Sequence, residues 1–391
     1  MTVRPVHQFR TVMAAAVVAA AVATTAFVAP GAASADTGQR TRSGHEGTQR
    51  ALEAAVEAGS PGALAGVARA GQRTWNGEAG VADRTDGRQR RPGDRFRVGS
   101  VTKTFVATVI LQLEAEGRLG LDDSVERWLP GLVRGNGHDG RAVTLRQLLN
   151  HTSGIYNYTD DPGFVRTVFG EGFFEHRYDT FRPRDLVRTA MGHKPYFAPG
   201  ADWHYSNTNY VLAGLVIEKV TGRPYGQEIE RRVLRPLGLR ATSVPGTRAR
   251  MPRPSGRAYS VLVGPEPGSA IHDVTELNPS GAGAAGEMIS TTGDLNRFYR
   301  ALLTGKLLPE KQLGKMTTTV PVGKEAPNHR YGLGLMAQKL SCGKEVWGHS
   351  GGIHGSSSEA VTTADGRHAL ALNFNSDWAG DSAAVIEAEF C

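Results

Sequence analysis

The sequence predicts a mixed α/β fold of the α+β kind, in which an antiparallel sheet flanked by helices is interrupted by a mainly helical region. Three observations indicate this fold: a helix and a strand pair open the chain, helical segments dominate its middle, and strands followed by a helix close it. The length of 391 residues, 40% of them hydrophobic and 21% charged, fits one large globular domain. We expect this domain at 36–391, with its sheet formed by about 48–104 and 285–391 and the helical insert at about 105–284.

The first 35 residues have the pattern of a secretory signal peptide. Arg4 and Arg10 precede an uncharged run at about 13–28, and Ala33-Ser34-Ala35 provides a small-residue cleavage site. A retained signal anchor is the alternative, but the run is short for a membrane span, and no later stretch offers about twenty apolar residues. We therefore expect a secreted protein without stable membrane insertion. Cleavage removes two arginines and no acid, which lowers the net charge from +7 to +5.

The mature chain should begin with a helix and a hairpin. Residues 48–58 place Ala, Leu and Val at helical spacing, and Pro61-Gly62 ends this helix. Residues 63–70 and 73–81 are typical of two short strands. After an Arg-rich loop, a second helix should begin at Ser100 and continue through an apolar run.

The middle of the chain is predicted to be mostly helical. Helices are expected at 119–129, 143–149, 184–191, 211–220 and 225–235. Thr144 is a plausible cap of the second of these. Residues 246–283 are rich in Pro and Gly and should form a loop, and the Gly/Ala run at 281–286 suggests close backbone approach. A further helix at 292–303 carries Asp294 in its first turn.

The C-terminal part predicts the rest of the sheet. Strands are expected at 330–336, 345–349, 357–362 and 368–375, followed by a closing helix at 379–390. The only two cysteines are Cys342 and Cys391, and two cysteines in an exported chain usually pair. We expect a disulfide between them, with two free thiols as the alternative.

The basic charge does not indicate a nucleic-acid partner. Arginine clusters such as 88–91 and 231–235 are spread along the chain, and no basic run is interleaved with aromatic residues. A solvated basic face is favoured over binding to an anionic surface such as a cell wall.

The segment around Ser100 is the first candidate for chemistry. Ser100 and Lys103 lie one turn apart, so a helix would place the hydroxyl and the amine on one face. A serine hydroxyl is inert at its ordinary pKa and needs a base, which a lysine can supply when burial lowers its pKa. Alone the pattern is weak, because Ser341 and Lys344 match it too, in what should be a turn. A capped helix with a surface lysine is the alternative.

Two other candidates are disfavoured. Gly348-His349-Ser350-Gly351-Gly352 matches the nucleophile elbow of α/β-hydrolases, but the residues after Ser350 do not predict the helix that the elbow requires. His349 and His354 lack the spacing of a zinc motif, and no carboxylate cluster joins them, so we expect no metal.

Three motifs together are far more specific than any one. Ser100-Val101-Thr102-Lys103, Tyr205-Ser206-Asn207 and His349-Ser350-Gly351 resemble, in order and spacing, those of the serine β-lactamase and penicillin-binding-protein family. The resemblance is to the branch that contains class C β-lactamases and, most closely, secreted Streptomyces D-alanyl-D-alanine carboxypeptidases. It covers nearly all of the mature chain and includes the Tyr331–Leu335 segment and the position of both cysteines. It implies a β-lactamase/transpeptidase-like fold with the active site between the sheet and the helical region.

The resemblance implies a role for each motif residue. Ser100 would be the nucleophile, Lys103 its base, and Tyr205 the relay of the proton to the leaving amine. Asn207 would orient Lys103 and donate to the substrate amide. No cofactor is implied.

The third motif would form the substrate-binding strand. His349, Ser350 and Gly351 would pair with the substrate backbone, and His349 stands where relatives often have Lys. The backbone N–H groups of Ser100 and Gly352 would form the oxyanion hole.

One departure from the resemblance concerns Met336. In the Streptomyces carboxypeptidases an Arg at this place binds the substrate's C-terminal carboxylate, an interaction worth roughly 1–3 kcal/mol. Strand alternation should put Gln338 on the face of Met336 and Lys339 on the other, unless a bulge re-aims it. Related D-stereospecific endopeptidases, D-aminopeptidases and esterases share the motifs without that Arg.

These observations lead to an expected function. We expect an exported, monomeric serine-type D-Ala-D-Ala carboxypeptidase or D-peptidase that forms an acyl-enzyme at Ser100. Its substrates would be peptides or peptidoglycan fragments, and β-lactams would acylate it. The alternatives on the same scaffold are a D-stereospecific endopeptidase or aminopeptidase, an esterase and a class C-like β-lactamase. A non-catalytic, wall-associated binding protein is disfavoured by the intact Ser, Lys, Tyr and His.

Overall fold

The computed structural model describes residues 44–262, 269–324 and 326–391. The signal peptide predicted at 1–35 lies outside the described residues. No helix in the described part of the chain is both long enough and apolar enough to span a bilayer.

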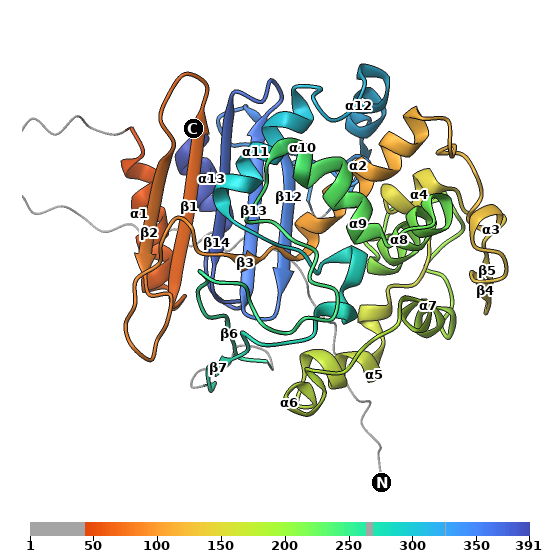
Figure 1. The fold of residues 1–391 in the computed structure, drawn as a ribbon, viewed down its shortest axis with the longest axis horizontal. Coiled ribbons are helices and arrows are strands. Elements are labelled where there is room, and N and C mark those ends of the chain that lie inside the picture. Colours follow the sequence, from red (N-terminus) through yellow and green to blue (C-terminus); the bar gives the residue numbers. More distant parts are fainter. Residues whose placement is uncertain (1–43, 263–268, 325) are drawn as a thin grey trace, which may run out of the picture. The chain divides into compact units, whose positions relative to one another are not determined.

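The central element is an eight-stranded antiparallel sheet with the strand order β2-β1-β14-β13-β12-β11-β10-β9. Figure 1 shows the N-terminal hairpin in orange beside the C-terminal strands in blue. The predicted fold class is therefore confirmed: the two ends of the chain share one sheet. The strands are β1 (Gly62–Arg69), β2 (Trp75–Gly80), β9 (Val320–Pro321), β10 (His329–Tyr331), β11 (Met336–Lys339), β12 (Glu345–Ile353), β13 (Ser356–Thr363) and β14 (His368–Phe374).

Helices cover both faces of the sheet. On one face, α1 (Glu46–Glu57) and α13 (Ser382–Phe390) bury apolar side chains such as Leu52 and Phe390 against Val67 and Leu372. On the other face lies α11 (Thr292–Leu303), whose Thr292 occupies the space that a side chain at Gly66 would need. The sheet is thus buried on both sides, which explains its many fully buried alanine, valine and leucine residues.

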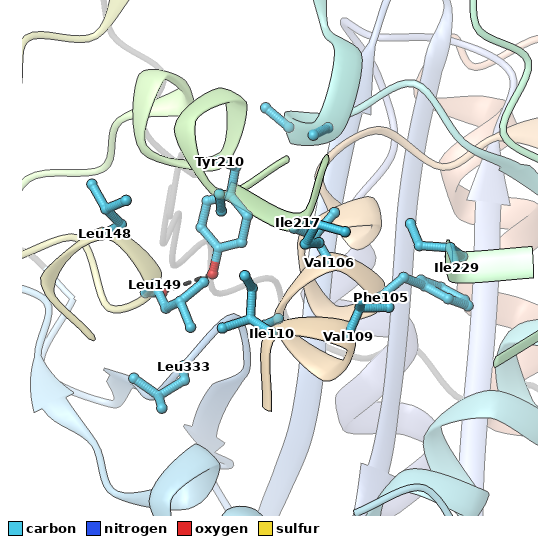
Figure 2. Packing of buried hydrophobic residues seen from close by; sticks show 14 of the residues in the cluster. Phe105, Val106, Val109, Ile110, Leu148, Leu149, Tyr210, Ile217, Ile229 and Leu333 are labelled. Carbon is cyan, nitrogen blue, oxygen red and sulfur yellow. Dashed lines mark hydrogen bonds between the residues drawn. The ribbon is translucent and has the colours of Figure 1, made fainter. Parts of the chain in front are cut away.

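The helical region packs around α2 (Thr102–Ala115), which is buried on nearly every side. Figure 2 shows Phe105 and Ile110 of α2 among residues from α8 (Asn207–Thr221), including Tyr210. The Tyr210 hydroxyl donates to the Leu149 carbonyl oxygen at 2.7 Å and so satisfies a buried polar group (Figure 2). Because α2 is enclosed by other elements, the residues at its N-terminus are fixed in position.

Other elements complete the region between the first hairpin and the last strands. Thr144 and Gln147 form a capping box at α4, as expected of the Thr144 cap. The remaining helices are α3 (Val125–Trp128), α4 (Leu145–Leu149), α5 (Pro162–Phe164), α6 (Phe173–His176), α7 (Pro183–Met191), α9 (Tyr225–Ile229), α10 (Arg235–Leu237) and α12 (Glu310–Thr317). The short strand pairs are β3 (Phe96–Arg97) with β8 (Ile289–Ser290), β4 (Arg134–Gly135) with β5 (His138–Asp139), and β6 (Tyr259–Ser260) with β7 (His272–Asp273).

Several expected elements differ from the structure, among them the helix predicted at 119–129, which is only Val125–Trp128, and the loop predicted at 246–283, which contains β6 and β7. The helix predicted from Ser100 begins with one 3₁₀ turn, Gly99–Val101, before α2. The single strand predicted at 330–336 is two strands, β10 and β11, because Gly332 N–H donates to the Leu335 carbonyl oxygen and closes a turn. The helix predicted at 225–235 contains a π-helical turn at Glu230–Leu234.

Cys342 and Cys391 form the predicted disulfide, which joins the turn between β11 and β12 to the end of α13. In the same turn Ser341 Oγ donates to Glu387 at 2.7 Å, and Lys344 Nζ donates to the Phe390 carbonyl oxygen at 2.6 Å. The second Ser-x-x-Lys match therefore lies in a turn, as expected, and connects it to α13.

Candidate active site

Ser100 lies in the 3₁₀ turn that joins β3 to α2, and its side chain is partly exposed while its neighbours are buried. Gly99 adopts φ +52°, and a Cβ there would lie 2.7 Å from the backbone nitrogen of Gly352. Thr102 Oγ accepts from the backbone N–H of Met288 at 3.1 Å. A left-handed glycine thus lets the turn lie directly against β12, with the Ser100 hydroxyl at the start of a helix.

Lys103 follows one helical turn later and has no exposed surface. Its Nζ lies 2.9 Å from Ser100 Oγ, 2.7 Å from Asn207 Oδ1 and 2.7 Å from the Ala285 carbonyl oxygen. Burial lowers the pKa of Lys103 well below its ordinary value, which favours the neutral amine. Both protons of a neutral amine are then taken by the two carbonyl oxygens, so its lone pair faces the Ser100 hydroxyl.

A carbonyl oxygen of the Gly/Ala run and the side chain of Asn207 both orient the Lys103 amine. The Ala285 carbonyl belongs to the run at 281–286, where the sequence suggested close backbone approach. Asn207 is the first residue of α8, and its backbone N–H donates to Asn157 Oδ1 at 2.9 Å. Its Nδ2 donates to Thr159 Oγ1 at 3.2 Å, which turns Oδ1 towards Lys103.

Tyr205 lies beside the same amine, with Lys103 Nζ 4.7 Å from the centre of its ring. Burial raises the pKa of Tyr205, and a hydrogen bond with Ser100 opposes that rise in pKa. The phenol therefore keeps its proton at neutral pH and can donate it to a group that leaves from the Ser100 side.

His151 also belongs to the site, although the sequence indicated only a turn there. Its ring centre lies 4.3 Å from that of Tyr205 and 4.8 Å from that of Tyr331, and the side chain is fully buried. Nδ1 accepts from the backbone N–H of Ser206 and from Asn209 Nδ2, so the proton is on Nε2. His151 therefore supports the ring of Tyr205 from behind. His151 has a φ of +63°, which is uncommon for a residue other than glycine, but this backbone angle cannot be read from a single sequence.

The segment of β12 that the sequence singled out lies against the Ser100 turn. A Cβ on Gly351 would lie 1.9 Å from the Val98 carbonyl oxygen and 3.1 Å from the Ser100 nitrogen, so only glycine fits. In the described sheet, pairing of β12 with β11 ends at the Met336–Gly348 pair, while pairing with β13 continues to Ile353. The edge after Gly348 is where an extended substrate could add as a strand.

His349 is neutral in this position. It is 1% exposed, its Nδ1 donates to the Ser350 carbonyl oxygen at 2.6 Å, and its Nε2 accepts from the Tyr331 hydroxyl at 2.7 Å. Burial and then the nearby Lys103 lower the pKa of His349 to about 3. His349 therefore offers no positive charge to a substrate, unlike the lysine that relatives often have there.

The elbow interpretation of Ser350 does not fit the structure. Ser350 lies in the middle of β12, opposite Glu359 of β13, and the chain turns directly into β13 after Ile353. An elbow requires a strand-to-helix turn at the serine. His354, the second histidine of the disfavoured metal motif, directs Nε2 to the Val168 carbonyl oxygen at 2.7 Å.

The strand that carries Met336 presents no cation near Ser100. Gln338 shares the face of Met336, as alternation predicts, and pairs with Val346 of the cluster under α1 and α13. This face is opposite to that of Gly351, which contacts Ser100. Lys339 is on the Ser100 face but pairs with Glu345, four residues or about 13 Å along β12 from His349.

Taken together, the site contains a hydroxyl with a neutral amine beside it, a protonated phenol, and the backbone of Gly352 against the Ser100 turn. These groups can carry out acyl transfer by a serine nucleophile. The chain belongs to the beta-lactamase family, since the model of that family, described as Beta-lactamase, matches residues 48–387.

Two solved structures are similar to this chain over most of its length. The structure of a D-stereospecific amidohydrolase from Streptomyces sp. is 64% identical, with a TM-score of 0.85 and coverage of 89% of this chain and 98% of that one. The D-amino acid amidase from Ochrobactrum anthropi SV3, solved with L-phenylalanine amide, is 30% identical, with a TM-score of 0.76 and coverage of 88% and 98%.

A penicillin-binding protein is also similar. Penicillin-binding protein 4* from Bacillus subtilis (strain 168) is 30% identical over 322 residues, which cover 78% of this chain and 66% of that protein. The chain thus spans just under two thirds of the length of this curated relative.

Proposed function

We propose that this chain is an exported serine amidohydrolase that forms an acyl-enzyme at Ser100 and cleaves amide bonds next to a D-amino acid. The observation that carries the proposal is the buried Lys103 amine, whose Nζ lies 2.9 Å from Ser100 Oγ and 2.7 Å from each of two carbonyl oxygens that orient it. The preference for D-amino acids is supported by the 64% identity to a D-stereospecific amidohydrolase. It agrees better with the alternative of a D-stereospecific endopeptidase or aminopeptidase than with the expected carboxypeptidase.

The chemistry follows from the positions of the groups. Lys103 takes the proton of Ser100 as Oγ attacks the substrate carbonyl carbon. The negative charge that develops on the carbonyl oxygen is stabilised by the backbone N–H groups of Ser100 and Gly352. Tyr205 gives its proton to the departing amine, and water then hydrolyses the ester on Ser100 by the reverse sequence of proton transfers.

The substrate side of the site favours an amide over a free carboxylate at the leaving group. The β11 strand offers a buried alanine, Ala337, where it faces the Ser100 side, and His349 is neutral. A carboxylate would find no charge-assisted partner near Ser100 on these two strands, because Lys339 lies opposite Glu345, whereas a neutral amide or a longer peptide needs none.

The proposal is tested by the hydrolysis of D- and L-phenylalanine amide. We expect turnover of the D-amide with a kcat/KM about 100-fold or more above that of the L-amide, because a displacement of about 1 Å at the reacting carbon costs this much. Ser100→Ala should abolish the turnover, while Ser350→Ala should keep it. Equal rates on both enantiomers would contradict the D-specific proposal, and turnover that persists in Ser100→Ala would contradict an acyl-enzyme at Ser100.

A second candidate, a penicillin-binding D-Ala-D-Ala carboxypeptidase, is favoured by the similarity to penicillin-binding protein 4*. Mass spectrometry after incubation with benzylpenicillin should show an adduct on Ser100, and an adduct on Ser350 would contradict both candidates. The rates on a D-Ala-D-Ala peptide and on its C-terminal amide separate them. A rate that is maintained on the amide supports the amidohydrolase, and a collapse on the amide supports the carboxypeptidase.

A further inference from the structure

A cavity lies beside β3 and is lined by none of the proposed catalytic residues. Its wall contains Arg90, Arg97, Gly256, Asn373 and Asn375. The cavity has a volume of about 20 Å³, which is room for one or two ligands of the size of a water molecule.

Two residues on the wall, Arg90 and Arg97, carry buried guanidinium groups with unused donors. Arg90 is 1% exposed, and its Nη2 donates to Asn373 Oδ1 at 2.8 Å. Arg97 is 2% exposed, and its Nη2 donates to the carbonyl oxygens of Ala249 and Leu277 at 2.8 and 3.0 Å. In both arginines Nε and Nη1 are buried and have no hydrogen-bond partner among the described residues. Four N–H-bearing nitrogens therefore lack an acceptor.

The acidic groups nearby leave Nε and Nη1 of both arginines without a hydrogen-bond acceptor. Asp94 lies 4.0 Å from Arg90 Nε but is also paired with Arg88 and accepts from a backbone N–H. Glu287 is the acid that acts on Arg97, yet burial raises the pKa of Glu287 to about 8, so it is mostly protonated at neutral pH. Arg257, also on the wall, is paired with Asp83 and Asp273.

Buried donors without an acceptor are costly. Burial lowers the pKa of Arg90 and of Arg97 to about 10, and each still carries its charge at neutral pH. The unused N–H groups of these charged side chains are therefore destabilising, and a small anion would supply the missing acceptors.

We propose that the cavity between Arg90 and Arg97 binds a small monovalent anion, of the size of chloride or formate. The anion accepts from the unused Nε and Nη1 groups. The second ligand position suits a water that donates to Asn375 Oδ1, another buried atom without a partner in the described chain.

The site is connected to the Ser100 turn through the backbone of Arg97. Ser356 Oγ donates to the Arg97 carbonyl oxygen at 2.7 Å, and Asn373, which accepts from Arg90, donates to Ser356 Oγ at 2.8 Å. An anion that fixes both guanidinium groups therefore fixes the backbone three residues before Ser100. The inference does not depend on the proposed substrate, because binding of the anion is measured without turnover.

The test is thermal and denaturant unfolding of the whole chain at pH 7 and constant ionic strength, with chloride or formate replacing bulky gluconate. Above the dissociation constant, each tenfold rise in the free concentration of the anion should raise the folding equilibrium constant about tenfold. A response to chloride alone or to formate alone identifies which anion fits. Equal stability in all three salts would overturn the proposal.

Variants distinguish anion binding in the cavity from anion binding to the basic surface in general. Arg97→Gln and Arg90→Gln should lose the dependence on chloride or formate, whereas Arg91→Gln, a change at an exposed arginine next to Arg90, should keep it. If the two cavity variants do not fold, a crystal of the unaltered protein grown in bromide decides. An anomalous peak within hydrogen-bond distance of Arg90 and Arg97 supports the site, and water alone at that place overturns it.

Discussion

Lys103 and His349 lie in the site with almost no exposed surface, and burial lowers the pKa of both. Burial favours the neutral form of both side chains, so the site gains a base at Lys103 and loses a cation at His349. The protein loses stability in exchange, because the unfolded chain binds protons that the folded chain does not. This makes the protonation of each residue measurable through unfolding.

Lys103→Met tests the base. Acylation should fall by at least about 10²–10⁴-fold, the usual contribution of a general base. From about pH 10.4 downwards the unfolded chain protonates Lys103 and the folded chain does not, so the unaltered protein loses about 1.4 kcal/mol per pH unit relative to the variant. Denaturant unfolding at several alkaline pH values measures this slope, which is independent of the lost hydrogen bonds. Parallel stability curves would show that Lys103 is charged when folded.

His349→Gln tests the neutral histidine in the acidic range. Below about pH 6.5 the unfolded chain protonates His349, and the folded chain does not until about pH 3. The unaltered protein should therefore lose up to about 1.4 kcal/mol per pH unit relative to the variant over this range. A limb near pH 6.5 in kcat/KM that disappears in the variant would contradict a neutral His349.

At the scale of elements, the contact between the Ser100 turn and β12 depends on two glycines. Gly99 has a positive φ, and Gly351 has no room for a side chain beside the Val98 carbonyl oxygen. The sequence indicated small residues in this strand, but not that the strand touches the nucleophile's own turn. That contact joins segments about 250 residues apart, and spacing along one sequence does not reveal it.

Gly351→Ala should separate β12 from the Ser100 turn. A Cβ 1.9 Å from a backbone oxygen forces the strand or the turn to move, so we expect kcat/KM to fall by about 100-fold or more. Gly314→Ala in α12 is the matched control, because nothing lies within 4 Å of that Cβ. The assay is amide turnover together with benzylpenicillin acylation. Unchanged acylation in Gly351→Ala would show that the contact is not needed for catalysis.

Other elements show where the sequence was sufficient and where it was not. The helix predicted at 292–303 is α11 with the same bounds, since its cap Thr291 and its apolar spacing are local signals. The strand predicted at 330–336 was wrong in its middle, because Gly334 takes φ +68° in a turn that strand-like residues surround. His151 was overlooked because its contacts with Tyr205 and Tyr331 exist only after folding.

At the scale of the whole molecule, the disulfide anchors the last helix to the sheet far from Ser100. The Cys342–Cys391 bridge closes a loop with a sequence separation of 49, for which the entropic estimate is about 4 kcal/mol. The double variant Cys342→Ser/Cys391→Ser should therefore lower the free energy of unfolding by about 2–4 kcal/mol, as measured with denaturant. At temperatures well below unfolding its kcat/KM should stay within about twofold, and a larger loss would connect the bridge to the site.

The composition and motifs predicted the fold class, yet they could not give the strand order. Pairing of β1 with β14 joins Ala63 to Phe374, and no local pattern specifies a partner at that distance. The expected boundaries of the helical insert remain a prediction. Tyr259 lies within that range, although its backbone N–H donates to the Asn375 carbonyl oxygen beside β14.

The pairing of β1 with β14 also determines how late in synthesis the sheet can be completed. While the chain is being made, the hairpin of β1 and β2 is complete long before residue 374 exists, and one edge of β1 stays open until then. Until β12 has been made, the Ser100 turn also lacks the strand against which it packs. Because the proposed site includes β12, an N-terminal fragment that lacks this strand cannot be an early active form. Sheet closure over such sequence distances is also slow. Ser100, the proposed nucleophile, is made in the first third of the chain, and its site is complete only when almost the last residues have been added.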